Sequence, residues 1–367
     1  MPSEDPRETG PSDRPDAPLD ERYPGLNVLT ADPENAETSA RSHLEGYLTP
    51  REEHYIRTHH RTPDIDADDW TVSLTGMVED GIELSMDEIR HDYPTDSVVH
   101  MMECSGNGRA YFDPDAEGDQ WTVGAVGSAI WTGTPVRDLL NDHDAATDEG
   151  LWLSVMGGEA KEGEDVFCRS IPMEKALDDC LLAYEMNGDP MTSEHGYPLR
   201  LLVPGWFGNN SVKWVDRIHV METMVVGEEW ESRDGHDYTE YQQSSYRIVP
   251  AQDDEPERHE SVGTFSTYEQ LRNPEEVRNA YLFDQLVKSL ITSPAEEATL
   301  SSDGRVEITG VAWAGDDAVE RVELSVDGGE TWDEATFDVR PRSPRRPEVP
   351  LRLGRESGPA HAPLAGD

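Results

Sequence analysis

The residue best suited to chemistry is a cysteine in the stretch HMMECSGNGRAYF, residues 100–112. Cys104 follows an apolar run and precedes a loop that contains two glycines, an asparagine and Arg109. A cysteine at a strand end, beside free N–H groups and a guanidinium, is expected to have a depressed pKa. Its thiolate is soft and suits sulfur-preferring metals. Cys104 is therefore a candidate nucleophile or metal ligand, unless it is simply a small buried hydrophobic residue.

The other cysteines do not extend this pattern. Cys168 and Cys180 are the only two besides Cys104, and the spacing of the three is irregular. This argues against a disulfide framework or a zinc knuckle, so we expect both residues to be buried in the core. The sequence also contains no G-x-G-x-x-G fingerprint, no P-loop and no C-x-x-C-H haem motif.

Acidic residues dominate the composition. The chain has 77 Asp and Glu against 30 Lys and Arg, a net charge of -47, and the excess is dispersed along its length. The only lysines are Lys161, Lys175, Lys213 and Lys288. Such a surface suits molar salt, where the screening length falls to about 3 Å, and we therefore expect a halophilic source. The absence of a basic face argues against nucleic acid as a partner.

The N-terminal stretch is polar and rich in proline. It contains neither the apolar core of a signal peptide nor a twin-Arg pair, and no run of eighteen apolar residues occurs anywhere. We therefore expect no membrane association and a cytoplasmic location. Residues 1–45 are expected to form an extended polar arm.

The elements that must position Cys104 alternate strands with short helices. Strand patterns occupy residues 70–78, 97–104, 151–158, 199–205 and 212–226. Residues 83–94 and 166–179 each indicate a strand leading into a short helix, and residues 134–143 begin with a helix-start signal. There is no regular βα repeat, so the pattern favours an α+β fold over a doubly wound sheet. The main domain is expected to span residues 46–250.

The C-terminal third differs in composition. Residues 251–290 are expected to form a polar connector with one helical segment over 273–290. Alternating strands and the hairpin signal SVDGGETW then indicate the start of an immunoglobulin-like sandwich over 291–340. The strand pattern stops there, and residues 341–367 are rich in Arg and Pro. We expect an incomplete sandwich followed by an aberrant tail, the product of a frameshift or truncation.

In combination, these motifs resemble the sulfite oxidase family of molybdenum-cofactor (molybdopterin) oxidoreductases. The Cys104 loop resembles the family's cysteine loop. Further segments follow in the family's order: YIRTHHRTP (55–63), QWTVGAVGSAIWTGTPVRDLL (120–140) and LAYEMNGDPMTSEHGYPLRLLVPGWFGNNSVKWVDRI (182–218). The segment around SVDGGETW resembles the family's dimer-forming domain. The resemblance runs from about residue 45 to residue 340.

The resemblance implies a mixed-sheet molybdopterin domain and the oxidation of sulfite to sulfate by oxo transfer. It implies that Cys104 supplies the protein's one ligand to the molybdenum. Arg57 and Arg109 would bind sulfite oxygens, and Trp121 would form a wall of the pocket. A local cluster of cations also makes physical sense, because a chain this acidic would otherwise repel an anionic substrate.

The remaining roles also follow from the resemblance. Tyr238, in GHDYTEY, would lie beside the metal, with Tyr241 as its competitor for that place. The residues expected to hold the pterin and its phosphate are His59, Asp138, His195, Arg200 and Lys213. Taken singly, each would be read as an ordinary core or surface side chain; the ordered set favours the functional interpretation.

Several features of the reaction stay open at this point. No haem domain is visible, so electrons would pass to an external acceptor, either a cytochrome or oxygen. The family's further substrate-site Arg near the C-terminus has no counterpart here, which bears on sulfite binding and on formation of a homodimer. The alternatives are a reductase of sulfoxides such as methionine sulfoxide, and a truncated copy that binds the cofactor without turnover.

Overall fold

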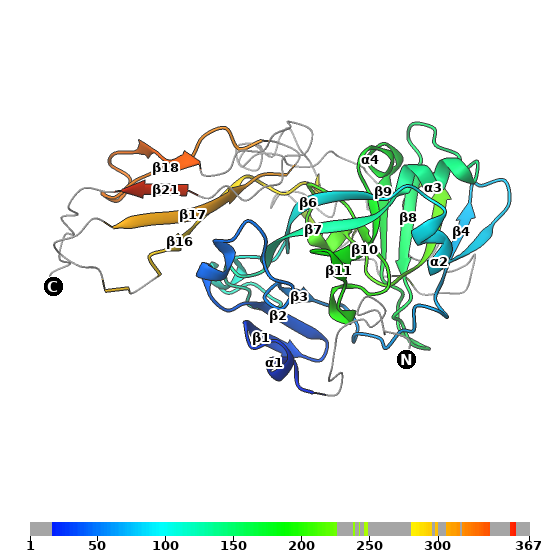
Figure 1. Cartoon of the computed structure of the whole chain (residues 1–367), viewed down its shortest axis with the longest axis horizontal. Helices are drawn as coiled ribbons and strands as arrows, with labels where there is room; N and C mark the ends of the chain where they lie inside the picture. Colours follow the sequence, from blue (N-terminus) through cyan, green and yellow to red (C-terminus); the bar gives the residue numbers. More distant parts are fainter. Residues whose placement is uncertain are drawn as a thin grey trace, which may run out of the picture.

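The computed structural model describes most of the chain. The described residues are 17–225, 238, 242, 246–248, 280–295, 298–299, 306–315, 318–337 and 353–356. Figure 1 shows a main body that contains strands β1 to β13 and an elongated extension that contains β16, β17, β18 and β21. Within the described residues, no helix is long and apolar enough to cross a membrane.

A small antiparallel sheet, in the order β1-β2-β3, begins the described chain. Its elements are α1 (Leu19–Arg22), β1 (Leu26–Ala31), β2 (Glu34–Thr38), the 3-10 helix η1 (Arg41–Leu44) and β3 (Ile56–Arg57). Leu19, Tyr23 and Leu26 pack against Ala36 and Ile56. The structure thus differs from the extended arm expected over 1–45, because from residue 17 onward spaced apolar side chains bury a core of their own.

The second sheet carries the cysteine loop. Its strands are β6 (Asp96–Glu103), β7 (Val126–Pro135), β10 (Leu181–Met186), β11 (Asp189–Pro190) and β12 (Arg200–Leu202). The order is β11-β10-β7-β6, and β12 also pairs with β10. Strands β6 and β7 stay in antiparallel register up to the pair Glu103 and Val126. Because β6 ends there, the sheet presents Cys104 at its edge.

A third, mixed sheet has the order β5-β4-β13-β8-β9, with β13 and β4 parallel. Its strands are β4 (Thr71–Gly76), β5 (Ile82–Ser85), β8 (Trp152–Gly157), β9 (Cys168–Pro172) and β13 (Val215–Met221). Helices α2 (Met86–His91), α3 (Val136–Asp142) and α4 (Met173–Asp178) complete this part. Helix α2 begins at a capping box formed by Ser85 and Glu88. The mixed sheets and short helices are those of an α+β fold, as expected.

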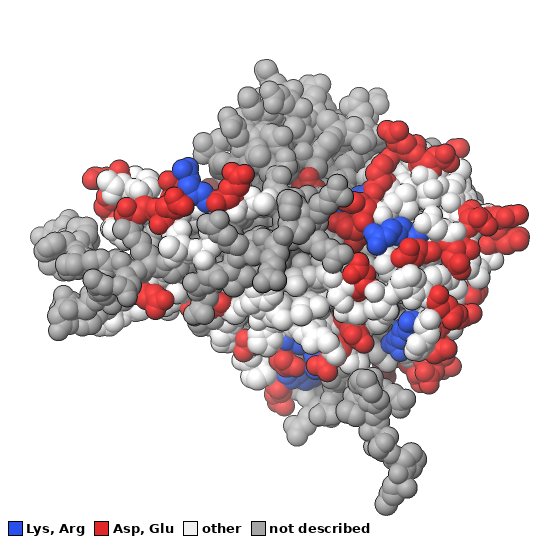
Figure 2. All heavy atoms as spheres, turned by 45° about the horizontal axis from the view of Figure 1, so that its top comes forward, with Lys and Arg blue, Asp and Glu red and all other residues white. Residues whose placement is uncertain are grey.

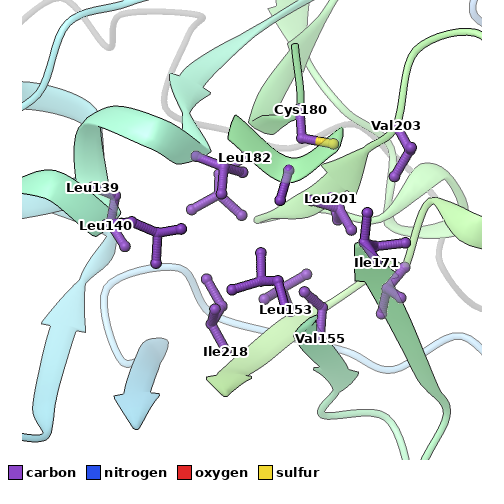
Figure 3. Close-up of a cluster of buried hydrophobic side chains, with 14 of the residues drawn as sticks. Leu139, Leu140, Leu153, Val155, Ile171, Cys180, Leu182, Leu201, Val203 and Ile218 are labelled. Carbon is purple, nitrogen blue, oxygen red and sulfur yellow. The ribbon is translucent and has the colours of Figure 1, made fainter. Parts of the chain in front are cut away.

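The main core lies between the second and third sheets. In Figure 3, Leu182 of β10 lies across from Leu153 of β8 and Ile218 of β13, and all three side chains are fully buried. Cys180 is buried in the same core, and Cys168 is buried in a neighbouring apolar cluster. Both cysteines are therefore core residues, as the sequence predicts.

The C-terminal strands form smaller sheets. They are β14 (Arg247–Ile248), β15 (Ala280–Tyr281), β16 (Lys288–Ser293), β17 (Glu307–Trp313), β18 (Glu323–Leu324), β19 (Asp333–Glu334), β20 (Thr336–Phe337) and β21 (Leu353–Glu356). One sheet has the order β16-β17-β21-β20, and β18 pairs with β19 across the SVDGGETW turn.

Two expectations differ from this arrangement. The helix expected over 273–290 is absent from its described part, where 280–281 and 288–290 are strand. The tail expected to be aberrant contributes β21, which pairs with β17 from Glu307–Glu356 to Gly310–Leu353. The sequence conceals these three strands because each has at most six residues and is flanked by polar residues or proline. Most of the connector and of the tail lies outside the described residues.

Candidate cofactor site

A cavity lies where the end of β6 meets β3, β12 and the segment that follows β12. Its lining consists of His54, Tyr55, Arg57, His59, Met102, Cys104, Glu159, Phe167, Glu194, His195, Arg200, Gly208, Asn209, Ser211, Lys213, Trp214 and Tyr246. Most residues that the sequence nominates for the site are therefore brought together, although they come from positions 57 to 213 of the chain.

Cys104 enters the cavity directly after β6. Its N–H donates to the carbonyl of Ala125 at 2.9 Å, and the N–H of Gly106 points to its Sγ at 3.4 Å. Burial raises the pKa of the Cys104 thiol, while the Gly106 N–H and the charges of Arg57 and Arg109 act in the opposite direction but less strongly. The expectation of a depressed pKa is therefore wrong for the chain alone, because desolvation outweighs the nearby cations.

Arg109 and Trp121 lie behind the cysteine loop and do not line the cavity. Arg109 is in the 3-10 helix η2 (Arg109–Tyr111) and donates from Nη1 to the carbonyl of Asp119 at 2.9 Å. A Cβ on Gly106 would lie 2.9 Å from Arg109 Nη2 and 3.0 Å from Trp121 Cδ1. Gly106 thus lets the loop close onto both side chains. Trp121, only 2% exposed, meets Tyr55 edge to face with ring centroids 6.5 Å apart.

Of the three tyrosines at 238, 241 and 246, the one that lines the cavity among the described residues is Tyr246. Arg57 donates from Nη2 to the Tyr246 hydroxyl at 3.3 Å, and both residues line the cavity. Tyr238, the residue nominated from the sequence, is instead buried in the apolar cluster of Met156 and accepts a hydrogen bond from Arg217 at 2.8 Å. The competing Tyr241 lies outside the described residues. Sequence spacing missed Tyr246, although it follows in the same tyrosine-rich segment.

Basic residues from the 195–213 segment form another part of the cavity wall, called here the basic wall. Arg200 donates to the carbonyl of His195 at 2.8 Å, and Lys213 donates from Nζ to the carbonyl of Glu194 at 2.8 Å. Burial lowers the pKa of Arg200 to about 10 and holds that of Lys213 well below its usual value. Burial also keeps His195 neutral, and its Nε2 lies 3.2 Å from the carbonyl of His54. Since a carbonyl only accepts, Nε2 carries the proton.

His59 and His60 lie next to the carboxylate of Asp165 at the edge of the cavity. His59 and His60 have ring centroids 4.2 Å apart, and Asp165 lies 3.4 Å from His59 Nε2 and 3.2 Å from His60 Nε2. Burial first, and the His60 charge second, lower the pKa of His59 to about 4. His59 is therefore neutral near pH 7 and can donate or accept a hydrogen bond at the cavity.

Asp138 does not reach the cavity. It lies on α3, whose Leu139 and Leu140 are buried in the main core, and it is absent from the cavity lining. The acidic residues that do line the cavity are Glu159 and Glu194. Burial raises the pKa of Glu159 to about 7. Sequence reasoning missed Glu159 because it lies in an acidic loop whose composition resembles the rest of the surface.

The cavity offers polar atoms for a bound group. Among the described residues, the atoms of its lining that are buried without a hydrogen-bond partner are His54 Nε2, Glu159 Oε2, Arg200 Nε and both amide atoms of Asn209. Buried polar groups are normally paired, so this set indicates a ligand rich in donors and acceptors. A pterin with a phosphate has that character, and Cys104 supplies a soft thiolate for a metal. The residues present therefore fit a molybdenum cofactor.

Comparison with known proteins agrees with this fit. Residues 59–228 match the family model "Oxidoreductase molybdopterin binding domain", and residues 280–352 match "Mo-co oxidoreductase dimerisation domain". The first match includes Cys104 and the basic wall of the cavity. The second begins at β15 and includes β16 to β20.

Similar proteins fall into more than one activity class. Mitochondrial sulfite oxidase of Mus musculus is 30% identical over 89% of this chain and 56% of its own length. Nitrate reductase [NADH] of Hordeum vulgare is 31% identical over 96% of this chain and 37% of its own length. The chain thus spans about half or less of these curated relatives.

The fold has a solved counterpart. The crystal structure of the sulfane dehydrogenase SoxCD from Paracoccus pantotrophus superposes with a TM-score of 0.70 at 26% identity, covering 95% of this chain and 81% of that chain. Two family models, similarity to a sulfite oxidase and a nitrate reductase over most of this chain, and a cavity with a cysteine and unpaired polar atoms all agree. The chain therefore belongs to the molybdenum-cofactor oxidoreductases.

Proposed function

We propose that this chain oxidises sulfite, or a closely related sulfur oxyanion, at a molybdenum cofactor ligated by Cys104. Sulfite and water would give sulfate, protons and an electron pair, and the electrons would leave to an external acceptor such as a cytochrome or oxygen. The observation that supports this most directly is the meeting of Cys104, Arg57 and Tyr246 at one cavity. The cofactor, when bound, supplies the oxygen transfer and the redox change.

The chain's own residues would bind and orient the anion. The Arg57 guanidinium presents several N–H donors in a fixed plane, which suits the oxygens of a sulfur oxyanion. The Tyr246 hydroxyl, 3.3 Å from Arg57 Nη2, offers a further donor beside it. Arg57 and Tyr246 are both half-buried, so each of these interactions is stronger than it would be at the open surface. Arg109 would add positive charge from behind the loop.

The basic wall would hold the cofactor. Lys213 and Arg200 direct positive charge toward the cavity, and they suit the phosphate of the pterin. Neutral His195 and His59, with the amide of Asn209, suit the pterin's ring nitrogens and oxygens. In this proposal Arg57 binds the anion, Lys213 anchors the cofactor, and Cys104, which lines the same cavity, supplies the ligand to the metal.

Two further features belong to the proposal. The match of residues 280–352 to a dimerisation domain supports a homodimer. The net charge of -47 supports a source with high internal salt. Figure 2 shows acidic side chains over much of the described surface of one face, with few basic ones.

Nitrate reduction is the second candidate, because a nitrate reductase is as similar to the chain as the sulfite oxidase is. Reduction of methionine sulfoxide uses related chemistry and is the third. The remaining alternative is that the chain is a truncated copy, which binds the cofactor but turns over no substrate.

Steady-state assays on one preparation, purified in high salt with its cofactor, separate these activities. Sulfite would be tested with ferricyanide as acceptor, and nitrate and methionine sulfoxide with reduced methyl viologen as donor. We expect turnover with sulfite, and little with the other two substrates. The same chain from a host that lacks the cofactor pathway is the control. Turnover of nitrate alone would replace the proposed substrate, and no turnover by molybdenum-loaded protein would favour the non-catalytic copy.

A further inference from the structure

A fully buried carboxylate stands next to Cys104 and has no role in the proposed chemistry. Glu103, the last residue of β6, is 0% exposed. Its Oε1 accepts from Lys288 Nζ at 2.5 Å and from Asn107 Nδ2 at 3.0 Å, and its Oε2 accepts from Trp313 Nε1 at 3.0 Å. Burying a charge is costly unless it is paired and hydrogen-bonded, and this one is both.

Strand alternation explains why two adjacent residues serve different regions. Successive side chains of β6 point to opposite faces of the sheet. Met102 and Cys104 belong to the apolar cluster beside the cavity, whereas Met101 packs with Val311 and Trp313 of the C-terminal region. Glu103 shares the face of Met101. The end of β6 therefore offers its thiol to the cavity and its carboxylate to the C-terminal sheet.

Two of the donors to Glu103, Lys288 and Trp313, are distant from it in the sequence but lie side by side in the C-terminal sheet. Lys288 opens β16, Trp313 closes β17, and the two are direct partners in the antiparallel register. Gln285 reinforces the contact by donating from Nε2 to the carbonyl of Met101 at 2.7 Å. Lys288 is also one of only four lysines in the sequence.

The third donor ties the carboxylate to the cysteine loop. Asn107 donates its N–H to the carbonyl of Cys104 at 2.9 Å, and its Oδ1 accepts from the N–H of Ala125 at 3.2 Å. Through Nδ2 the same side chain binds Glu103. The carboxylate thus fixes the amide that closes the loop around Cys104, and its own position depends on Lys288 and Trp313.

We propose that Glu103 is a positioning residue, through which the β16–β17 end of the C-terminal region holds the Cys104 loop in place. This inference rests on the proposed function for its biological meaning, because only there does Cys104 serve as the metal ligand. Loss of Lys288 leaves the buried Glu103 charge uncompensated, so the carboxylate and Asn107 shift and the loop opens. The C-terminal region then contributes to the cofactor site without touching the cofactor.

The test measures the rate at which iodoacetamide alkylates Cys104 in the cofactor-free chain at high salt, by peptide mass spectrometry. Cys168 and Cys180 are buried and serve as internal controls for global opening. The Lys288→Met variant is expected to alkylate about tenfold faster at Cys104, with both controls unchanged. Lys288→Arg, which keeps the charge, is expected to restore the slow rate.

Two further variants serve as controls for the alkylation experiment. Lys175→Met removes another lysine ion pair, that with Asp179 at 3.1 Å, and is expected to leave Cys104 unchanged. Trp313→Phe removes one donor to Glu103 while keeping an aromatic ring, and is expected to speed Cys104 alkylation even if Lys288→Met does not fold. An unchanged Cys104 rate in both Lys288→Met and Trp313→Phe overturns the proposal, as does an equal rise at all three cysteines. Because the readout needs no metal, a chain without molybdenum would refute the proposed function and not this coupling.

Discussion

At the scale of single residues, the cavity wall holds cations that donate to the backbone rather than to carboxylates. Lys213 donates to the carbonyl of Glu194, and Arg200 donates to the carbonyls of His195 and Ser211. Burial first, and the Arg200 charge second, lower the pKa of Lys213, and a bound phosphate would raise it again. The wall is therefore arranged to gain most from an anionic ligand.

The choice between two tyrosines is testable at this scale. Tyr246→Phe is expected to lower kcat for sulfite by about a hundredfold, the usual effect of removing one donor that stabilises a transition state. Tyr238→Phe is the matched control, because that hydroxyl accepts from Arg217 outside the cavity lining. It should lower the free energy of unfolding by about 1 kcal/mol and leave kcat unchanged. A larger loss of kcat in Tyr238→Phe would return the role to Tyr238.

Glu159 predicts a pH-dependent stability of the cofactor-free chain. Burial raises its folded-state pKa to about 7, above the value of about 4.5 in the unfolded chain. The folded state therefore binds the proton more tightly, and this stabilisation is lost as pH rises from about 4.5 through 7. Glu159→Gln should gain about 2 to 3 kcal/mol relative to the parent chain between pH 5 and pH 8. Urea unfolding at both pH values measures this, and a pH-independent difference would contradict it.

Local sequence was informative for some site residues and uninformative for others. Cys104, His195, Arg200 and Lys213 stand in motifs whose neighbours also build the site, so a linear pattern identifies them. Tyr246 is brought to the cavity by tertiary contacts, among them that with Arg57, which no local pattern encodes. The resemblance also places Asp138 at the cofactor. The local sequence does not reveal that α3 packs against the main core, away from the cavity.

At the scale of elements, the sheet that carries Cys104 depends on close backbone contact. A Cβ on Gly133 of β7 would lie 2.1 Å from the carbonyl oxygen of Leu182 and 2.6 Å from Ala183 Cα, both on β10. Only glycine fits there without moving one strand. The β7–β10 pairing positions β6 in turn, because β6 is hydrogen-bonded to β7 along its whole length.

Gly133→Ala is therefore expected to lower the free energy of unfolding by about 2 to 3 kcal/mol, through strain between two central strands. Gly81→Ala is the matched control, since the nearest atom to its added Cβ would be 3.7 Å away. That variant should remain within about 0.5 kcal/mol of the parent chain. Urea unfolding followed by tryptophan fluorescence measures both variants. Equal stabilities would contradict the prediction, because β10 would then move to accommodate the added Cβ at little cost in free energy.

Elements with clear periodicity were predictable, and those stabilised by tertiary contact were not. Strands β4, β6, β8, β9 and β17 follow apolar patterns, and helices α2, α3 and α4 follow recognisable starts. Strands β1, β2 and β21 lie in segments whose acidic, Arg-rich or Pro-rich composition is typical of tails. Strands β1 and β2 pair with each other, and more distant strands, β3 for β2 and β17 for β21, complete the hydrogen bonding.

At the scale of the whole molecule, charge is the dominant feature. A net charge of -47 places repulsive acidic groups over the surface in Figure 2, while the cavity holds Arg57, Arg200 and Lys213. Salt screens the surface repulsion far more than it affects buried pairs. High salt should therefore stabilise the fold and leave the local attraction for an anion largely intact.

The melting temperature of the chain is accordingly expected to rise by about 5 °C or more between 0.1 M and 2 M KCl. Differential scanning calorimetry at several KCl concentrations measures this rise. Betaine at matched osmolality controls for effects other than charge screening. A melting temperature independent of KCl would mean that the acidic surface does not reflect adaptation to salt.

The central claim is that Cys104 binds the molybdenum of a pterin cofactor, and the molybdenum environment tests it most directly. X-ray absorption at the molybdenum edge would be recorded on the parent chain and on Cys104→Ser, both purified in high salt from a host that makes the cofactor. The parent is expected to contain molybdenum with one more sulfur ligand than the variant, whose other sulfurs come from the cofactor alone. Identical sulfur coordination in both proteins, or no molybdenum in the parent chain, would contradict the claim.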